Sequence, residues 1–566
     1  MRAEAEVPVL IVGAGPAGLM TGLLLRRLGV DACIVERRDG PQRAPAAHVV
    51  NARTFEICRQ AGVDMDAIAA AAQSPADAGA TWWVTQLGGE VLGRLPFERQ
   101  DDDVLALTPT PLRNLSQHRF EPILLHALRG AGAGAPRYGH RWEAATADAE
   151  GVTSTITDAA SGRRYALRSR YLIAADGAGS AVRRARGIEP IGPDCLQRFA
   201  MIHFEADLRA LVRDCPGVLY WVCDPACSGI FVAHDIDREW VFMHALAEDA
   251  DGIDAARGEV LVRRALARPD IALTVRTAAT WTMTCQVAER YRDGRVFLVG
   301  DAAHRFPPSG GMGLNTGVQD VHNLAWKLAA VLAGRAPAAL LDSYEQERRP
   351  IAQYNAEQSL QNAMRLMEVQ QALGFSEDAQ TARRNYAAVL ADAAGRRAVG
   401  DAIARQAEHF DMLGLQLGYA YAAGALLSDG EPPPACANPV RDFVPSSRPG
   451  ARLPHGWLMV DGARCSSLDL IDLARPTLLV GAAGGAWLDA AQALQPALAC
   501  RRIGGAVADP DGWWAAVAGM TPGGALLVRP DQHVAFRCRA AAADAPAELR
   551  RALAAALGDA ASEPTA

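Results

Sequence analysis

Three glycines and one glutamate near the start of the chain have the spacing of a dinucleotide-binding site. Gly13, Gly15 and Gly18 form the sequence G-x-G-x-x-G between an apolar run and a helical pattern, and Glu36 ends the next apolar run. Glycines let a pyrophosphate approach the backbone, the helix N-terminus carries partial positive charge, and the acid can accept hydrogen bonds from a ribose. The pattern therefore predicts that this region binds a dinucleotide.

Two later segments repeat the order of apolar strand, acidic residue and glycine-rich turn. The segment "YLIAADGAGSAVR" (171–183) contains Asp176, and "GDAAHRFPPSGGMGLNTGVQD" (300–320) contains Asp301, five glycines and two adjacent prolines. So few side chains leave room for a flat group to pass close to the backbone. Three strand-end motifs that converge on one ligand indicate a long dinucleotide lying across the edge of a sheet.

Taken together, the three motifs resemble those of the FAD-dependent aromatic hydroxylases, the single-component flavoprotein monooxygenases of the para-hydroxybenzoate hydroxylase type. The resemblance covers about residues 7–360. The segments "AHVVNARTFEI" and "LSQHRFEPILL" are similar to the branch that holds 2-hydroxybiphenyl and dichlorophenol hydroxylases, and aromatic-polyketide hydroxylases share much of the pattern. The resemblance implies hydroxylation of a phenolic substrate through a flavin C4a-hydroperoxide, with FAD as cofactor, NADPH or NADH as transient electron donor, and O2.

The resemblance also assigns residues to the cofactor. Asp301 would hydrogen-bond a ribityl or ribose hydroxyl, the helix that begins near Gly313 would point its N-terminus at the flavin pyrimidine ring, and Arg43 would lie near the phosphates. Asp176 matches a residue linked to both FAD and the reduced nicotinamide, although it could also cap the next helix. The residues expected to bind the cofactor are Gly13, Gly15, Ala17, Gly18, Glu36, Arg37, Arg43, Gln117, Asp176, Asp301, Pro308, Gly311, Gly313, Leu314 and Asn315.

His48 is the expected catalytic residue, because phenolate is a better electron donor than phenol and a nearby base would help to form it. It matches the histidine of "AHVVNARTFE"-type segments, and the alternative of a histidine that only bonds backbone beside FAD stays open. Tyr220, Trp221 and Asp224 lie in an alternating, aromatic-rich segment and are expected to contact the substrate, although aromatic residues in strands are more often core.

The expected fold is α/β: a Rossmann-like FAD-binding domain with an inserted β-sheet substrate domain, a helical middle segment and a thioredoxin-like C-terminal domain. A chain of 566 residues is expected to form two to four domains. The expected FAD-binding domain is discontinuous, and the tail resembles the C-terminal domain of the family's longer members without a redox cysteine pair. The expected ranges are 1–75, 105–190 and 285–365 for the FAD-binding domain, 76–104 and 191–284 for the substrate-binding sheet domain, 366–430 for the helical segment and linker, and 440–560 for the thioredoxin-like domain.

Composition narrows the remaining possibilities. The formal net charge is −7, which argues against a nucleic-acid partner because phosphate binding needs a concentrated positive field. The eleven cysteines show neither zinc-ligand spacing nor a Cys-x-x-Cys pair, so no metal is expected. We see no apolar span long enough for a membrane, and we expect a cytoplasmic protein that could form a homodimer.

Three alternatives compete with this function, and the sequence argues against the first. A flavin-dependent halogenase would need a Trp-x-Trp-x-Ile-Pro segment and a catalytic lysine, which "TWWV" and Lys327 do not provide. A flavin-binding regulatory or interaction protein is compatible with the same motifs. Among hydroxylases, we prefer a simple or substituted phenol over a polycyclic polyketide as substrate, and the sequence leaves this choice open.

Overall fold

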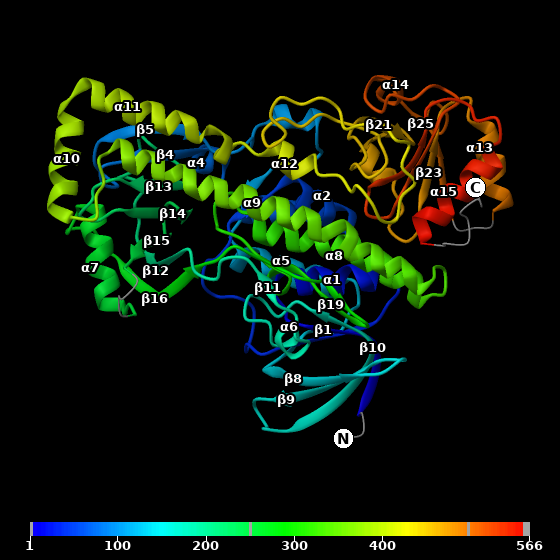
Figure 1. The fold of residues 1–566 in the computed structure, drawn as a ribbon, viewed down its shortest axis with the longest axis horizontal. Helices are drawn as coiled ribbons and strands as arrows, with labels where there is room; N and C mark the ends of the chain where they lie inside the picture. The colour runs from blue at the N-terminus through cyan, green and yellow to red at the C-terminus, as the bar shows by residue number, and fades with distance from the viewer. Residues whose placement is uncertain (1–3, 248–251, 495–497, 559–566) are drawn as a thin grey trace.

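The computed structural model describes residues 4–247, 252–494 and 498–558. The expected ranges 1–75, 191–284 and 440–560 therefore include short stretches that lie outside the described residues. Figure 1 shows three bodies: a central one that contains the N-terminal strand β1 (Ala5–Val12), a β-sheet body on the left and a C-terminal body on the right. The helix α9 (Ser343–Ala372) runs between the left and right bodies.

The central body is built around β1 (Ala5–Val12), whose apolar second half is buried. This strand pairs in parallel with β2 (Ala32–Glu36) and β10 (Arg164–Ala174), and β10 pairs in parallel with β19 (Val296–Leu298). The carboxyl ends of these four strands meet at one edge, where open α/β sheets bind their ligands. The sheet thus brings the three glycine-rich turns together.

Helices and short strands complete this body. The long helices α1 (Pro16–Arg27), α5 (Gln117–Gly130) and α8 (Met312–Leu332) pack side by side on the sheet, with α1 between the other two. The shorter elements are β3 (Val49–Val50), α2 (Ala52–Gln60), α3 (Met65–Ala71), α4 (Pro75–Ala78), β6 (Arg113–Asn114), β7 (Arg137–Tyr138), β8 (His140–Ala147), β9 (Val152–Asp158), α6 (Ala181–Ala185), β11 (Pro190–Ile191), β17 (Gln286–Ala288), β18 (Arg292–Asp293) and β20 (His304–Arg305).

The second body is a seven-stranded sheet with the order β16-β12-β15-β14-β13-β4-β5. Its strands are β4 (Ala80–Val84), β5 (Val91–Pro96), β12 (Gln197–Glu205), β13 (Leu219–Val222), β14 (Gly229–Asp235), β15 (Glu239–Leu246) and β16 (Thr274–Met283). The helix α7 (Ala255–Leu266) covers one face with a buried aromatic core. Because successive side chains of a strand point to opposite faces, every second residue faces away from α7, and on β12, β15 and β16 these residues include cavity-lining side chains.

The C-terminal body contains a four-stranded sheet of order β24-β23-β26-β27, in which β23 and β24 are parallel and the other pairs antiparallel. This is the expected arrangement of strand–helix units that end in a hairpin. Its elements are β21 (Trp457–Val460), β22 (Ala463–Ser466), β23 (Thr477–Val480), α13 (Gly485–Ala493), β24 (Ala499–Arg502), β25 (Val507–Ala508), α14 (Trp513–Ala516), β26 (Ala525–Val528), β27 (Val534–Cys538) and α15 (Ala545–Leu557).

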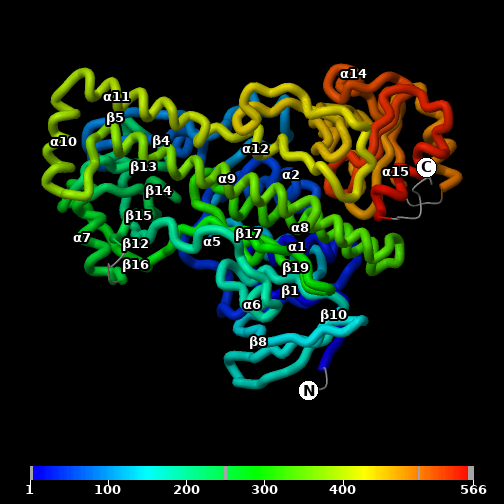
Figure 2. Tube along the Cα trace, in the orientation of Figure 1, coloured from blue at the N-terminus to red at the C-terminus, as the bar shows by residue number. Residues whose placement is uncertain are grey.

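A helical segment connects the second and third bodies. It consists of α9, α10 (Ala379–Ala391), α11 (Ala393–Ala404) and α12 (Leu413–Leu417), followed by an extended linker that leads into the C-terminal body. The trace in Figure 2 shows α10 and α11 beside the seven-stranded sheet. Within the described residues, no helix combines the length and the apolar character needed to cross a membrane.

Candidate active site

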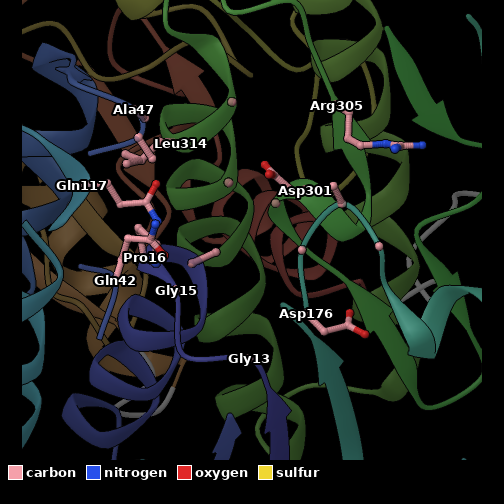
Figure 3. A pocket seen from close by; sticks show the side chains of 18 of the residues that line it. Gly13, Gly15, Pro16, Gln42, Ala47, Gln117, Asp176, Asp301, Arg305 and Leu314 are labelled. Atoms are coloured by element: carbon pink, nitrogen blue, oxygen red, sulfur yellow. The ribbon is translucent and has the colours of Figure 1, made fainter. Parts of the chain in front are cut away.

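A cavity of about 1160 Å³ lies between the central sheet and the seven-stranded sheet. Its walls come from the three glycine-rich turns, the segment 42–49 and the strands β12, β15 and β16. Ordinary small-molecule pockets occupy roughly 300–1,000 Å³, so this cavity has room for a large ligand and a second, smaller one. Figure 3 shows Gln42, Gln117 and Leu314 on one side of the cavity and Asp176, Asp301 and Arg305 on the other.

The first glycine-rich turn fits a dinucleotide closely. Gly13 has a φ of +107°, and a Cβ on it would lie 2.1 Å from the carbonyl oxygen of Ala175. A Cβ on Gly18 would lie 2.0 Å from the carbonyl oxygen of Gly13, so both glycines are needed for the strand, turn and helix to pack. Gly15 has no atom within 4 Å of its Cβ position and lines the cavity, so it leaves backbone open to a ligand.

The carboxylate of Glu36 is fixed at the end of β2 on the cavity wall. One oxygen accepts a hydrogen bond from the backbone N–H of Ala14 at 2.8 Å, and the other accepts one from the N–H of Arg38 at 2.9 Å. The neighbouring Arg37 and Ala17 also line the cavity. These residues lie where the sequence pattern places a ribose and a phosphate.

The two strand-end aspartates differ in their surroundings. The Asp176 carboxylate accepts hydrogen bonds from the Ser180 hydroxyl at 2.5 Å and the Val182 N–H at 3.1 Å, so it caps α6 while it lines the cavity. The Asp301 side chain is open to the cavity, yet the surrounding protein desolvates it and raises its pKa. Asp301 is therefore the aspartate that has a carboxylate available for a ligand hydroxyl.

The start of α8 presents backbone N–H groups to the cavity. Its N-cap is Gly311, at φ +63°, which has no side chain to cap the first turn, and Gly313 and Leu314 line the cavity. The first N–H groups of a helix lack intrahelical partners and carry partial positive charge. Pro307 and Pro308 border the same part of the wall. This end of the cavity therefore suits the electron-rich edge of a flavin.

Asn315 is buried and does not line the cavity, and its side chain has a structural role. Its side-chain NH2 group donates to the carbonyl oxygens of Val49 (2.9 Å) and Gly311 (2.7 Å), and its oxygen accepts from the Asn51 N–H (2.9 Å) and the Thr54 hydroxyl (2.7 Å). The side chain thus ties the start of α8 to the segment that carries His48.

Replacing Asn315 by alanine should lower the free energy of unfolding by about 2–3 kcal/mol, because each buried polar group left unpaired costs about 1–3 kcal/mol. Denaturant unfolding would measure this loss. Asn385→Ala is the control, because Asn385 makes one part-buried bond to the Gly374 carbonyl and should lose no more than about 1 kcal/mol. Equal losses in both variants would contradict the bridging role.

His48 lines the cavity, and its Nδ1 lies 3.0 Å from the Asn114 side-chain oxygen. Its ring also meets the ring of His234 edge-on, with centroids 5.6 Å apart. Burial lowers the pKa of His48 to about 4, although the bond to Asn114 opposes the shift. The imidazole is therefore neutral near pH 7, so it can hydrogen-bond a phenol but is a weak base. This weakens the prediction that His48 accepts the proton.

The structure does not bring the three predicted substrate residues into the cavity wall. Tyr220 is fully buried on the α7 face, and Trp221 points to the opposite face but packs against Trp83 and Phe410. Asp224 accepts a hydrogen bond from the Ala226 N–H in the turn after β13. They lie outside the cavity wall because β13 is two strands farther from the cavity than β15 is.

Arg43 also lies outside the cavity wall. Its side chain is 80% exposed and pairs with Asp39 at 3.0 Å. The neighbouring Gln42 and Ala44 line the cavity instead. The segment is irregular, so no periodicity in the sequence fixes which of its side chains points inward, and the prediction for Arg43 is corrected accordingly. Gln117 does line the cavity, where its amide donates to Glu121.

Sequence reasoning missed the part of the wall that the seven-stranded sheet supplies. In register across three strands, Met201 on β12 faces Met243 on β15 and Ala279 on β16, and His203 faces Val241 and Thr277. All six residues line the cavity. The alternation in "FAMIHFE" could have indicated Met201 and His203 as one face of a strand, but it does not tell which face meets the cofactor.

Comparisons with known proteins agree with this geometry. A family model described as "FAD binding domain" matches residues 6–359, and one described as "Aromatic-ring hydroxylase, C-terminal" matches residues 446–560. The tetracenomycin A2 monooxygenase-dioxygenase of Streptomyces glaucescens is 37% identical, over 97% of this chain and 96% of the relative. The 2,4-dichlorophenol 6-monooxygenase of Delftia acidovorans is 34% identical, over 97% of each chain.

Among solved structures, the flavin-dependent monooxygenase PieE in complex with FAD and substrate has a TM-score of 0.92 and 37% identity, and the match covers 99% of this chain and 100% of that one. The α/β fold, FAD as cofactor and the expected enzyme class are confirmed by these matches. The chain belongs to the FAD-dependent aromatic-ring hydroxylases.

Proposed function

We propose that this hydroxylase acts on a phenol that is part of a fused, polycyclic ring system, with NADPH or NADH as electron donor and O2 as oxygen source. The supporting observation is the continuous cavity, which has a dinucleotide-type turn at one end and a broad sheet face with both apolar and polar side chains at the other. That face spans β15, β12 and β16. Strands lie about 4.8 Å apart, so three of them form a wall about 10 Å wide, which exceeds a single ring.

The similar proteins include enzymes for both substrate classes. The relatives named above are a tetracenomycin monooxygenase-dioxygenase and a dichlorophenol monooxygenase, and another solved structure with 32% identity is aklavinone-11 hydroxylase with FAD and aklavinone. The width of this sheet wall is the reason to favour the larger class here, in place of the simple phenol that the sequence favoured.

Bound FAD supplies the chemistry that accepts hydride and activates O2. The chain's own task is to hold the cofactor, exclude water and orient the ring. We assign cofactor contacts to the turn at Gly13 and Gly15, to Glu36, to Asp301 and to the N–H groups at the start of α8. On the substrate side, Met201 and Met243 would cover the ring, and His48 would lie beside it as an uncharged imidazole.

Adding the right phenol should accelerate NAD(P)H oxidation and yield a product with one additional oxygen atom. The purified holoenzyme would be assayed with 1,8-dihydroxyanthraquinone as a fused-ring probe and 2,4-dichlorophenol as a single-ring probe, by absorbance and mass spectrometry. Faster turnover of the single-ring probe would contradict the proposed substrate class. If no phenol in a wider series changed NAD(P)H oxidation, a flavin-binding regulatory protein would become the better reading.

The cellular location and the oligomeric state belong to the same proposal. We place the protein in the cytoplasm, where reduced nicotinamide cofactors are available and free cysteines stay reduced. A homodimer also remains a proposal, and measuring the molar mass in solution would test it.

A further inference from the structure

A cluster of four histidines and one glutamate lies where the central body meets the seven-stranded sheet. Its members are His48, His118, His203, His234 and Glu239, and we call it the histidine–glutamate cluster. His118 comes from the first turn of α5, and the last three come from β12, β14 and β15. Only His48 and His203 of the five line the cavity, so the cluster has two imidazoles that a substrate could reach.

Glu239 is the charged centre of this cluster. One of its oxygens lies 3.3 Å from Nε2 of His203, and the other lies 3.1 Å from Nε2 of His118 and 3.3 Å from the guanidinium of Arg119. Burial alone would raise the pKa of Glu239, but the close imidazoles of His118 and His203 outweigh it and hold the pKa well below its usual value. Glu239 is therefore a carboxylate throughout the neutral pH range.

The imidazoles of His234 and His48 are poorly suited to accept a proton. Burial, with a smaller contribution from neighbouring His48, lowers the pKa of His234 well below its usual value, and its Nδ1 bonds the Ser116 hydroxyl. Burial lowers the pKa of His48 to about 4. Of the two imidazoles of the cluster that line the cavity, only His203 has an anionic partner.

We propose that His203 accepts the phenolic proton of the substrate and that Glu239 is a positioning residue which stabilises the imidazolium formed there. This inference rests on the proposed phenolic substrate. A carboxylate beside an imidazole fixes the ring and stabilises its protonated form, as in hydrolase triads. The O–H bond of the phenol breaks and an N–H bond forms on the imidazole, while the electron pair stays on the phenolic oxygen.

The proton returns to the substrate oxygen after a ring carbon has been hydroxylated. The product's phenolic oxygen then takes the proton back from His203, and the proton displaced from the hydroxylated ring carbon leaves in the water formed from the second oxygen atom of O2. The remaining groups around His203 and Glu239 are already paired with one another: Arg119 also contacts Asp235, and Glu205 pairs with Arg238 and Arg276. Thr277 on β16 is the uncharged neighbour across the strand pair.

The test compares His203→Asn and Glu239→Gln with the wild type, using whichever phenol of the series above turns over fastest. Product formation would be followed as a function of pH. General bases contribute typically 10²–10⁴-fold, so His203→Asn should lower the rate at pH 7 about 100-fold. Its deficit should shrink as pH rises toward the pKa of the phenol used, which is about 10 for a plain phenol and lower when the ring carries chlorine or carbonyl groups, because the substrate then enters as phenolate. Glu239→Gln, which removes only the charge, should lose about tenfold.

His244→Asn is the matched control. His244 lies on the same sheet with its Nδ1 2.7 Å from the Ser228 carbonyl, it does not line the cavity, and its replacement should leave the pH profile unchanged. FAD content and melting temperature would report on folding. The proposal is overturned if His203→Asn keeps the wild-type profile, if its loss is the same at every pH, or if both cluster variants lose FAD. A wild type that hydroxylates no phenol would instead remove the proposed function, and this inference with it.

Discussion

Replacing Glu347 by alanine should lower the free energy of unfolding by about 3–5 kcal/mol, the loss measured when one partner of a buried ion pair is removed. Glu347 lies on α9 with no solvent exposure, and its carboxylate accepts hydrogen bonds from Arg529 at 2.6 and 2.8 Å and from Lys327 at 2.7 Å. Arg529 comes from the C-terminal body and Lys327 from α8. The substitution would therefore leave buried cations without their shared partner at the point where three parts of the chain meet.

The pH dependence of this effect has a definite sign. Burial alone would raise the pKa of Glu347, but the charges of Arg529 and Lys327 lower it from 4.5 to about 2. A carboxyl group with a depressed pKa stabilises the fold above its unfolded pKa and loses this contribution as pH falls toward its folded pKa. The difference in unfolding free energy between wild type and Glu347→Ala should therefore shrink as pH falls from about 4.5 toward about 2.

Glu368→Ala provides the control for this prediction. Glu368 lies on the same helix and pairs with Arg405 at 2.8 Å, but its side chain is 39% exposed. Exposed pairs contribute about 0–1 kcal/mol, so this variant should unfold almost like the wild type. Denaturant unfolding of both variants would measure their free energies of unfolding. A loss below about 1 kcal/mol for Glu347→Ala would show that this ion-pair network does not hold the C-terminal body in place.

The sequence predicted the edge of the central sheet well, for a physical reason. The parts of that edge are local: an apolar strand, a turn that only glycine can make, and a helix start all lie within a few residues of one another. Gly13, Glu36, Asp176 and Asp301 could thus be found one motif at a time, and the parallel sheet brings them to one cavity. The family resemblance and the fold class were confirmed on the same basis.

The substrate side could not be predicted in this way, because it depends on which strands become neighbours. Tyr220 and Trp221 have the composition expected of a pocket, but the order of the sheet places β13 beside β4 and away from the cavity. His203 meets Glu239 only because β12 pairs with β15, which no local pattern reveals. Buried ion pairs such as Glu347 with Arg529 are likewise set by the packing of distant segments.

Replacing Gly15 by alanine should weaken FAD binding by roughly ten- to hundredfold while it leaves the fold nearly intact. Gly15 has φ −76°, which any residue adopts, and no atom lies within 4 Å of its Cβ position, so the methyl group would protrude only into the cavity. Intrusion of a methyl group into a well-packed contact costs about 1–3 kcal/mol, and 1.4 kcal/mol is tenfold in affinity. Because alanine is a poorer helix N-cap than glycine, the substitution should also lower the free energy of unfolding by up to about 1 kcal/mol.

Two other glycines show why Gly15 is the informative position. Gly13→Ala would combine a φ of +107° with a contact of 2.1 Å to the Ala175 carbonyl oxygen, so it should destabilise the fold itself. A loss of FAD binding in that variant would therefore not show whether the turn contacts FAD. Gly130→Ala, at the exposed end of α5 with open space around it, should change neither stability nor FAD affinity. The measurements are FAD titration by fluorescence and the melting temperature of the apoprotein. Wild-type affinity in Gly15→Ala would mean that the pyrophosphate does not pass over this turn, because the added methyl group has no other neighbour to disturb.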